Sequence, residues 1–178
     1  MKIILTSFFI LSLLNNSIQA QVAYHKEIKI LNAGLGAEMY GVYGSSDFPP
    51  LIVGLQYGVH DRISVGGLIG YSSSSYGYQG YNWSYSYFFI GARGEYHLVY
   101  PQVDIPKNLD LYGGLTLGFN IVTVSEPANS VSGYTSEGSY AIFGFHIGGR
   151  YYFSEKIGAF LELGYGVAVI TVGASFKL

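Results

Sequence analysis

Ionisable side chains are few in this sequence, and several of them lie inside otherwise apolar segments. His146 and Arg150 are four residues apart, and Glu162 follows in the next segment. If the residues that flank a short turn at 154–156 face each other, Gly148 lies opposite Glu162, and the carboxylate lies diagonally between His146 and Arg150. Such a cluster could act as a proton-sensitive latch or as a catalytic acid and base. Buried charges more often pair with one another, so we predict a paired interior cluster.

Other residues with catalytic potential form no complete set. A serine nucleophile needs a histidine within hydrogen-bond reach. His25, His60 and His97 lie near the ends of apolar segments, where solvated or interfacial positions are expected. His146 has Gly148, and not a serine, at the neighbouring position on the inward face. No metal-ligand spacing or phosphate-binding loop occurs. We therefore predict no catalytic residue, no metal ligand and no cofactor, and a chain that is not an enzyme.

The segments that carry these residues have the period of β-strands. Apolar residues recur at every second position, which is typical of a strand with two unlike faces. In residues 141–153, aliphatic and aromatic side chains fall mainly on one face, whereas His146 and Arg150 fall on the other. This period predicts eight strands, at residues 28–38, 51–59, 63–72, 85–98, 109–122, 139–153, 157–166 and 169–178.

The composition favours a chain surrounded by lipid. Hydrophobic residues make up 49% of the chain and charged residues 11%, whereas soluble domains have roughly 25% charged residues. After residue 20, no run approaches the roughly 20 consecutive apolar residues of a membrane-spanning helix. A closed β-barrel is the other structure that satisfies its backbone hydrogen bonds within hydrocarbon. The formal net charge of -2 gives no basic surface for nucleic acid.

The first twenty residues have the features of a secretory signal peptide. Lys2 supplies the positive start, the apolar stretch runs from Ile3 to Leu14, and the small residue Ala20 suits a cleavage site. The absence of cysteine excludes a disulfide and the acylated cysteine of a lipoprotein. We predict removal of a signal peptide at residues 1–20 and a single β-barrel domain at residues 21–178.

The connections and the aromatic residues indicate how the barrel lies in its membrane. Longer polar connections are predicted at residues 39–50, 73–84 and 123–138, and they should face outward, whereas short turns should face the periplasm. One set of aromatic residues on the aliphatic faces contains Tyr57, Tyr96, Tyr151 and Phe176. The set near the opposite strand ends contains Tyr71, Phe119 and Tyr165. Since amphipathic rings prefer the membrane interface, we predict two aromatic girdles.

The two faces of the strands differ in a way that assigns the interior. A soluble barrel would place its apolar face inward and its charged face outward. The less apolar face here carries mainly Gly, Ser, Thr and Tyr, with far fewer charges than the roughly 25–35% expected of a solvated surface. We therefore predict that the aliphatic face meets lipid. The ionisable residues predicted to fill the lumen are Glu38, Arg93, Glu95, Asp110, His146, Arg150, Glu162 and Lys177.

In these features the chain resembles the small outer-membrane barrels of the OmpA transmembrane-domain and OmpX type, of the outer membrane β-barrel domain family of Gram-negative bacteria. The resemblance covers the mature chain and includes the terminal strand at residues 170–178. Leu178 stands where the family usually ends in an aromatic residue, and Phe176 lies two residues earlier on the same face. The resemblance implies an all-β, up-and-down barrel of about eight strands in the cell outer membrane, a porin-like envelope protein. It also implies contact with outer-membrane lipids and assembly by the barrel-assembly machinery.

These observations favour a non-enzymatic protein with a structural, adhesive or surface-interaction role through its outer loops. The Ser- and Tyr-rich tract at residues 71–87 could contact a sugar, a protein or another surface ligand that the sequence does not identify. A narrow pore for small solutes is the alternative. Some small outer-membrane barrels are lipid A-modifying enzymes, and this third hypothesis requires a serine or carboxylate within hydrogen-bond reach of a histidine at the interface.

Overall fold

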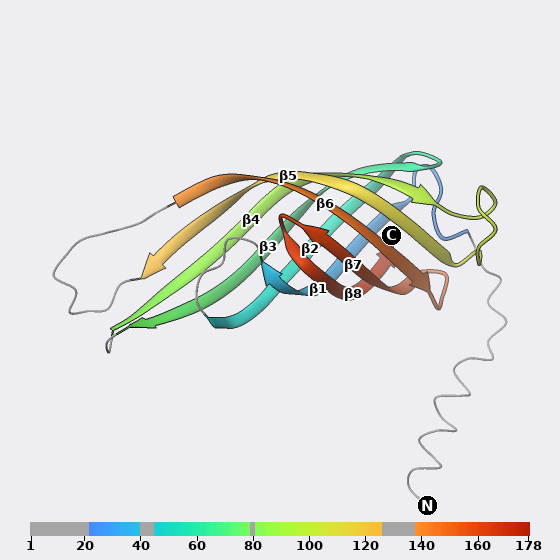
Figure 1. Cartoon of the computed structure of the whole chain (residues 1–178). Helices are drawn as coiled ribbons and strands as arrows, with labels where there is room; N and C mark the ends of the chain where they lie inside the picture. Colours follow the sequence, from blue (N-terminus) through green and yellow to red (C-terminus); the bar gives the residue numbers. More distant parts are fainter. Residues whose placement is uncertain (1–21, 40–44, 79–80, 126–137) are drawn as a thin grey trace, which may run out of the picture.

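The chain folds into a closed antiparallel barrel of eight strands (Figure 1). The computed structural model describes residues 22–39, 45–78, 81–125 and 138–178. The strands are β1 Lys29–Met39, β2 Ser45–His60, β3 Ile63–Tyr78, β4 Tyr81–Leu98, β5 Leu109–Ser125, β6 Gly138–Tyr152, β7 Ile157–Tyr165 and β8 Ala168–Lys177. Each strand pairs with its neighbours in the sequence, and β1 pairs with β8 to close the barrel. The predicted up-and-down barrel of eight strands is therefore confirmed. In the described ranges, no helix is long and apolar enough to cross a membrane.

The two ends of the barrel differ (Figure 1). One end, here called the turn end, carries the β2–β3, β4–β5 and β6–β7 connections. The opposite end, here called the loop end, carries the β1–β2, β3–β4, β5–β6 and β7–β8 connections. The β7–β8 connection consists of Gly166 and Val167, and Gly166 has a φ of 98°, a backbone region that favours glycine.

Strands β2, β3 and β4 extend farther toward the loop end than the sequence predicted. β3 continues to Tyr78, which pairs with Tyr81 of β4, so most of the predicted loop at 73–84 is the outer part of a long hairpin. β2 begins at Ser45, inside the predicted loop at 39–50. Both loop predictions were wrong in extent because residues such as Asp47, Pro49, Gly77 and Asn82 have a weak intrinsic preference for strands, whereas pairing with a neighbouring strand decides the outcome here.

The barrel interior has three layers. An apolar layer toward the loop end consists of Ile52, Leu68, Tyr87, Phe89, Ile142, Val167 and Ala168. An apolar layer at the turn end consists of Ala23, Tyr24, Ile28, Ile30, Val99 and Tyr152. The buried charged side chains lie between these layers. Because both apolar layers limit access of water, the charges between them must be compensated by one another.

The outward face is aliphatic and aromatic. Leu117, Phe145 and Ile147 are 62%, 54% and 64% exposed, respectively, although large apolar side chains of this kind are normally buried in a soluble protein. The alternation therefore has the sense predicted for a barrel in lipid, with apolar side chains outward and ionisable side chains inward.

Candidate functional site

Most of the ionisable residues predicted for the lumen lie together in the middle polar layer. The buried members are Arg93 and Glu95 of β4, Asp110 of β5, His146 and Arg150 of β6, and Glu162 of β7. Inward-facing glycines leave room for these long side chains. A Cβ atom on Gly114, for example, would lie 2.8 Å from Cε1 of His146.

The first ion pair crosses the lumen from β4 to β7. Arg93 Nη1 donates hydrogen bonds to both carboxylate oxygens of Glu162, each at 3.0 Å. Tyr112 donates its phenolic proton to the same carboxylate at 3.0 Å, and Arg93 Nε donates to Thr116 Oγ1 at 3.2 Å. Side chains from β4 and β5 thus hold the Glu162 carboxylate of β7.

This pairing corrects the cluster predicted from the sequence. The predicted register is confirmed, because Gly148 lies opposite Glu162. The predicted partner is wrong, because Glu162 pairs with Arg93, whereas Arg150 pairs with other carboxylates. Register along one sheet gives the nearest neighbours on adjacent strands, but a long arginine side chain also reaches across the lumen of a closed barrel.

The second ion-paired group is centred on Arg150, which is fully buried. Its Nη2 atom donates to Glu95 Oε2 at 2.8 Å, and its Nη1 atom donates to Asp110 Oδ2 at 2.9 Å. The guanidinium also lies 3.7 Å from the centre of the Tyr112 ring, within cation–π distance. His146 Nε2 lies 3.3 Å from Glu95 Oε1, whereas Arg150 bonds to the other oxygen of that carboxylate, Oε2.

A third group was missed in the sequence. His97 is fully buried rather than solvated or interfacial, with Nε2 2.9 Å from Ser64 Oγ and Nδ1 2.9 Å from Asp110 Oδ1. Tyr24 stacks on the His97 ring at 3.7 Å between centroids and an angle of 8°. Burial raises the pKa of the Tyr24 phenol well above its usual range. The sequence did indicate the inward position of His97, because His97 lies two residues after Glu95 and therefore on the same face of the strand.

Ser64, His97 and Asp110 have the connectivity of a serine-nucleophile triad, but their surroundings argue against catalysis. All three side chains are fully buried, and Tyr24 covers His97. In this conformation an ester substrate could not reach Ser64.

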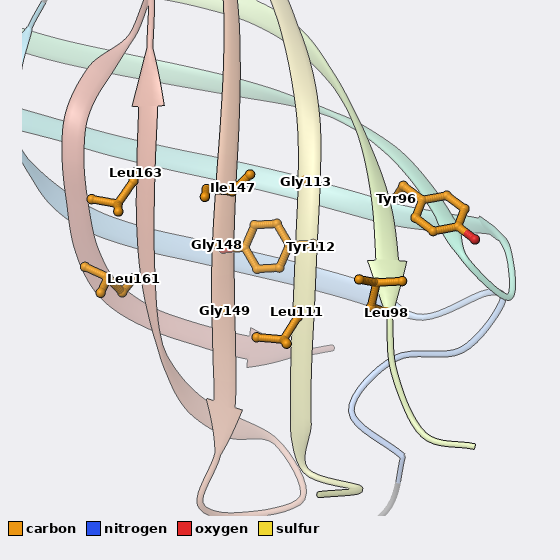
Figure 2. A pocket seen from close by; sticks show the side chains of 10 residues that line it. All are labelled: Tyr96, Leu98, Leu111, Tyr112, Gly113, Ile147, Gly148, Gly149, Leu161 and Leu163. Carbon is orange, nitrogen blue, oxygen red and sulfur yellow. The ribbon is translucent and has the colours of Figure 1, made fainter. Parts of the chain in front are cut away.

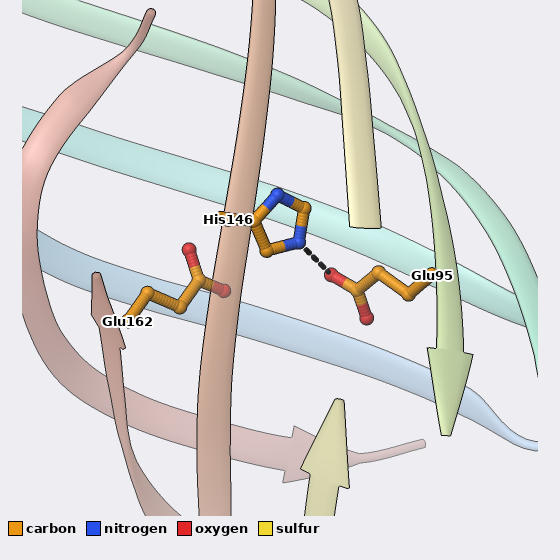
Figure 3. A group of neighbouring side chains, drawn as sticks. All are labelled: Glu95, His146 and Glu162. Atoms are coloured by element: carbon orange, nitrogen blue, oxygen red, sulfur yellow. Dashed lines mark hydrogen bonds and ion pairs between the residues drawn. The ribbon is translucent and has the colours of Figure 1, made fainter. Parts of the chain in front are cut away.

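Glu95, His146 and Glu162 could offer metal ligands, because one ligand atom from each lies within 4.8 Å of the others (Figure 3). However, Glu95 already accepts a hydrogen bond from Arg150, and Glu162 accepts two from Arg93. A cation bound by these atoms would lie beside the guanidinium groups of Arg93 and Arg150, whose positive charges oppose its binding. These residues therefore do not fit a metal site.

The remaining lumen candidates lie apart from these groups. Lys177 lies at the turn end, where Nζ donates to the carbonyl of Val22 at 3.2 Å and lies 4.1 Å from the centre of the Tyr152 ring. Glu38 belongs to β1, but its side chain is outside the described residues.

The aromatic residues of the two predicted girdles lie toward opposite ends of the strands. Tyr57, Tyr96 and Tyr151 are exposed near the turn end, and Phe176 is half-buried there. Tyr71, Phe119 and Tyr165 are exposed farther toward the loop end. Their positions are compatible with the two membrane interfaces.

The loop end presents a second group of aromatic residues on the β3–β4 hairpin. Tyr76 pairs with Trp83 across the hairpin, and their ring centroids are 6.3 Å apart. Tyr85 and Tyr87 follow on β4 with the same parity as Trp83, and their rings are 6.4 Å apart. Tyr76 is 48% exposed, Trp83 and Tyr85 are half-buried, and Tyr87 is buried in the apolar layer. The aromatic row thus leads from the hairpin into the mouth of the barrel.

Comparison with solved structures shows the fold. The N-terminal β-barrel domain of Pseudomonas aeruginosa OprF has a TM-score of 0.58 and 16% sequence identity, over 86% of this chain and 98% of that domain. The outer-membrane protein Ail of Yersinia pestis in a phospholipid bilayer nanodisc has a TM-score of 0.51 and 14% identity, over 86% of this chain and 100% of Ail. No protein-family model and no curated protein sequence matches the chain. The chain therefore has the fold of the eight-stranded outer-membrane β-barrels.

Proposed function

We propose that the chain is a non-enzymatic outer-membrane protein whose loop end interacts with surfaces or molecules outside the cell. Residues 1–20 act as the export signal, and residues 21–178 form the barrel, which the barrel-assembly machinery inserts. The fold shared with OprF and Ail supports this location. The apolar outward face supports it independently, because such a surface needs lipid to cover it.

In the proposed orientation, the loop end faces outward and the turn end faces the periplasm. Small bacterial outer-membrane barrels have short periplasmic turns and longer extracellular loops. The two aromatic girdles then lie at the two membrane interfaces, where their rings contact outer-membrane lipids. The interior supports a closed barrel, because ion-paired side chains fill it between two apolar layers.

The observation that carries the surface role is the β3–β4 hairpin, whose paired strands continue to Tyr78 and Tyr81 at the loop end. Tyr76 and Trp83 form an aromatic pair near its tip, and serines occupy neighbouring positions on both strands. Tyr and Trp offer large, rigid contact surfaces, and Ser offers adaptable hydrogen bonds. Paired strands hold these groups in fixed relative positions, which lowers the entropic cost of binding.

The test compares cells that produce the wild-type protein with cells that produce a Tyr76→Ser, Trp83→Ser double variant. We expect wild-type cells to be retained on glass or mucin-coated surfaces above the level of cells without the protein, and the double variant to fall to that level. Tyr100→Ser, in the turn-end connection, is the control and should leave retention unchanged. Equal retention of wild type and double variant, at equal amounts in the outer membrane, would exclude the hairpin as the contact surface.

A narrow pore for small solutes is the alternative function. It would require the Arg93–Glu162 and Arg150–Glu95 ion pairs to separate, because they cross the lumen in the closed barrel. The conductance of the Glu162→Gln variant in planar bilayers tests this alternative.

A further inference from the structure

The lipid-facing surface of the barrel is hollowed over β4 to β7, in a groove of about 630 Å³ (Figure 2). Gly113 and Gly149 lack side chains at the floor of the groove, whereas Ile147, Leu161 and Leu163 border it on β6 and β7. The lining is aliphatic and aromatic, so the groove suits a hydrocarbon chain. A second apolar groove of about 580 Å³ lies beside Gly67 and provides an internal comparison.

One border of the first groove carries a cation. Tyr96 lines the groove, and its hydroxyl accepts a hydrogen bond from Arg62 Nη1 at 3.1 Å. The Arg62 backbone N–H donates to His60 Nδ1 at 3.3 Å, which helps to hold the β2–β3 turn. Within the described part of the chain, no ion pair engages Arg62, so its other N–H groups remain available for an anion. The groove thus combines an apolar floor with a positive charge at its turn-end border.

We propose that this groove binds a glycerophospholipid of the inner leaflet, with an acyl chain over Gly113 and Gly149 and the lipid phosphate on Arg62. A guanidinium makes charge-assisted hydrogen bonds to phosphate oxygens, and the Tyr96 hydroxyl orients it. The assignment to the inner leaflet rests on the proposed orientation, in which the turn end faces the periplasm. Diffuse lipid contact would need only the apolar face, whereas a specific site needs both the groove and the cation.

The headgroup is tested by native mass spectrometry of the folded, full mature chain in detergent, titrated with dipalmitoyl phosphatidylglycerol or with dipalmitoylglycerol, which lacks the phosphate. Arg62→Gln should weaken phosphatidylglycerol binding by about tenfold, since a charged hydrogen bond is lost. It should leave dipalmitoylglycerol binding unchanged. Lys26→Gln removes another exposed turn-end charge, on a residue that does not line the groove, and should change neither. Equal phosphatidylglycerol binding by wild type and Arg62→Gln would overturn the headgroup site.

The acyl-chain site is tested by filling the groove. A Cβ atom on Gly113 would lie 3.6 Å from its nearest neighbours, an ordinary contact, so Gly113→Leu should fold and occupy the groove. It should weaken binding of both lipids. Gly67→Leu is matched, because its Cβ atom would lie 3.5 Å from the nearest atom but in the other groove, and it should have no effect. Equal lipid binding by wild type and Gly113→Leu would overturn the site. Recovery of the wild-type chain outside the outer membrane would instead contradict the proposed location.

Discussion

The Glu162 carboxylate provides the sharpest test at the scale of single residues. Glu162→Gln keeps the size of the side chain but removes the charge of the carboxylate whose two oxygens accept hydrogen bonds from Arg93 Nη1, and leaves Arg93 with the more distant Glu95 Oε1 at 3.6 Å. Loss of one partner of a buried pair costs roughly 3–5 kcal/mol. We expect a decrease of this order in the free energy of unfolding, measured with urea in lipid vesicles. Glu155→Gln, in the exposed β6–β7 turn, should have little effect, and equal stability of the two variants would contradict the buried pair.

The same two variants test the pore alternative in planar bilayers. If the ion pairs alone close the lumen, Glu162→Gln should show a conductance that wild type and Glu155→Gln lack. The apolar layers at both ends of the interior lead us to expect no such conductance. A stable open channel in Glu162→Gln would therefore favour a latent pore over a purely structural interior.

The inward direction of the charged residues could be predicted from the sequence, but their partners could not. Alternation along a strand decides which face a residue occupies, and this placed Arg93, Glu95 and Glu162 correctly inside. Alternation does not decide which side chains meet across a closed lumen. The Arg93–Glu162 pair joins residues 69 positions apart. The contact of Tyr24 with His97 also depends on how the segment before β1 folds onto the turn end.

At the scale of a strand, β5 tests which face meets lipid. Leu117 is 62% exposed on the outward face. Leu117→Arg should lower stability in vesicles by about 2–4 kcal/mol if the residue lies near the bilayer midplane. Thr123→Arg is matched, because Thr123 lies on the same strand and face but six residues nearer the loop end. It should cost about 0–1 kcal/mol. Equal losses of stability in Leu117→Arg and Thr123→Arg would contradict the assigned lipid face.

Close packing between strands and lumen side chains gives a second element-scale prediction. A Cβ atom on Gly118 of β5 would lie 2.7 Å from Phe89 Cζ and 2.8 Å from Gly91 Cα. Gly118→Ala should therefore destabilise the barrel by about 1–3 kcal/mol through overpacking. Gly94→Ala is the control, because its Cβ atom would have its nearest neighbour, the Ser64 carbonyl oxygen, at 4.0 Å. The free energy of unfolding in urea distinguishes the two variants. An unchanged value for Gly118→Ala would show that the apolar layer around Phe89 can rearrange.

The strands themselves were predictable because a transmembrane barrel imposes one period throughout the chain. The predicted strand at 109–122 corresponds to β5 Leu109–Ser125, and the predicted strand at 157–166 corresponds to β7 Ile157–Tyr165. The outer extents of β3 and β4 were not predictable from hydrophobicity. In residues 72–78 of β3 and 81–87 of β4, both strand faces are polar or aromatic, so the apolar alternation stops although the backbone ladder continues.

At the scale of the whole molecule, the two ends are built differently. The turn end is sealed by the segment before β1, in which the Ala23 N–H donates to the Lys107 carbonyl at 2.7 Å and Tyr24 covers His97. The loop end projects a hairpin with an aromatic pair. A filled interior joins them. This division suits a protein that presents a rigid surface outside the membrane while its barrel stays closed.

Removal of residues 1–20 concerns the whole molecule, because the new N-terminus would adjoin the segment that seals the turn end. Cleavage after Ala20 would leave Gln21 as the first residue, directly before the segment that seals the barrel. We expect intact-mass spectrometry of outer-membrane fractions to find a chain that starts at Gln21. Ala20→Arg should block processing, because signal peptidase requires a small residue there, whereas Ala20→Ser should be processed normally. An uncleaved wild-type chain in the outer membrane would contradict the signal peptide, and a processed chain that remains soluble in the periplasm would contradict the membrane location.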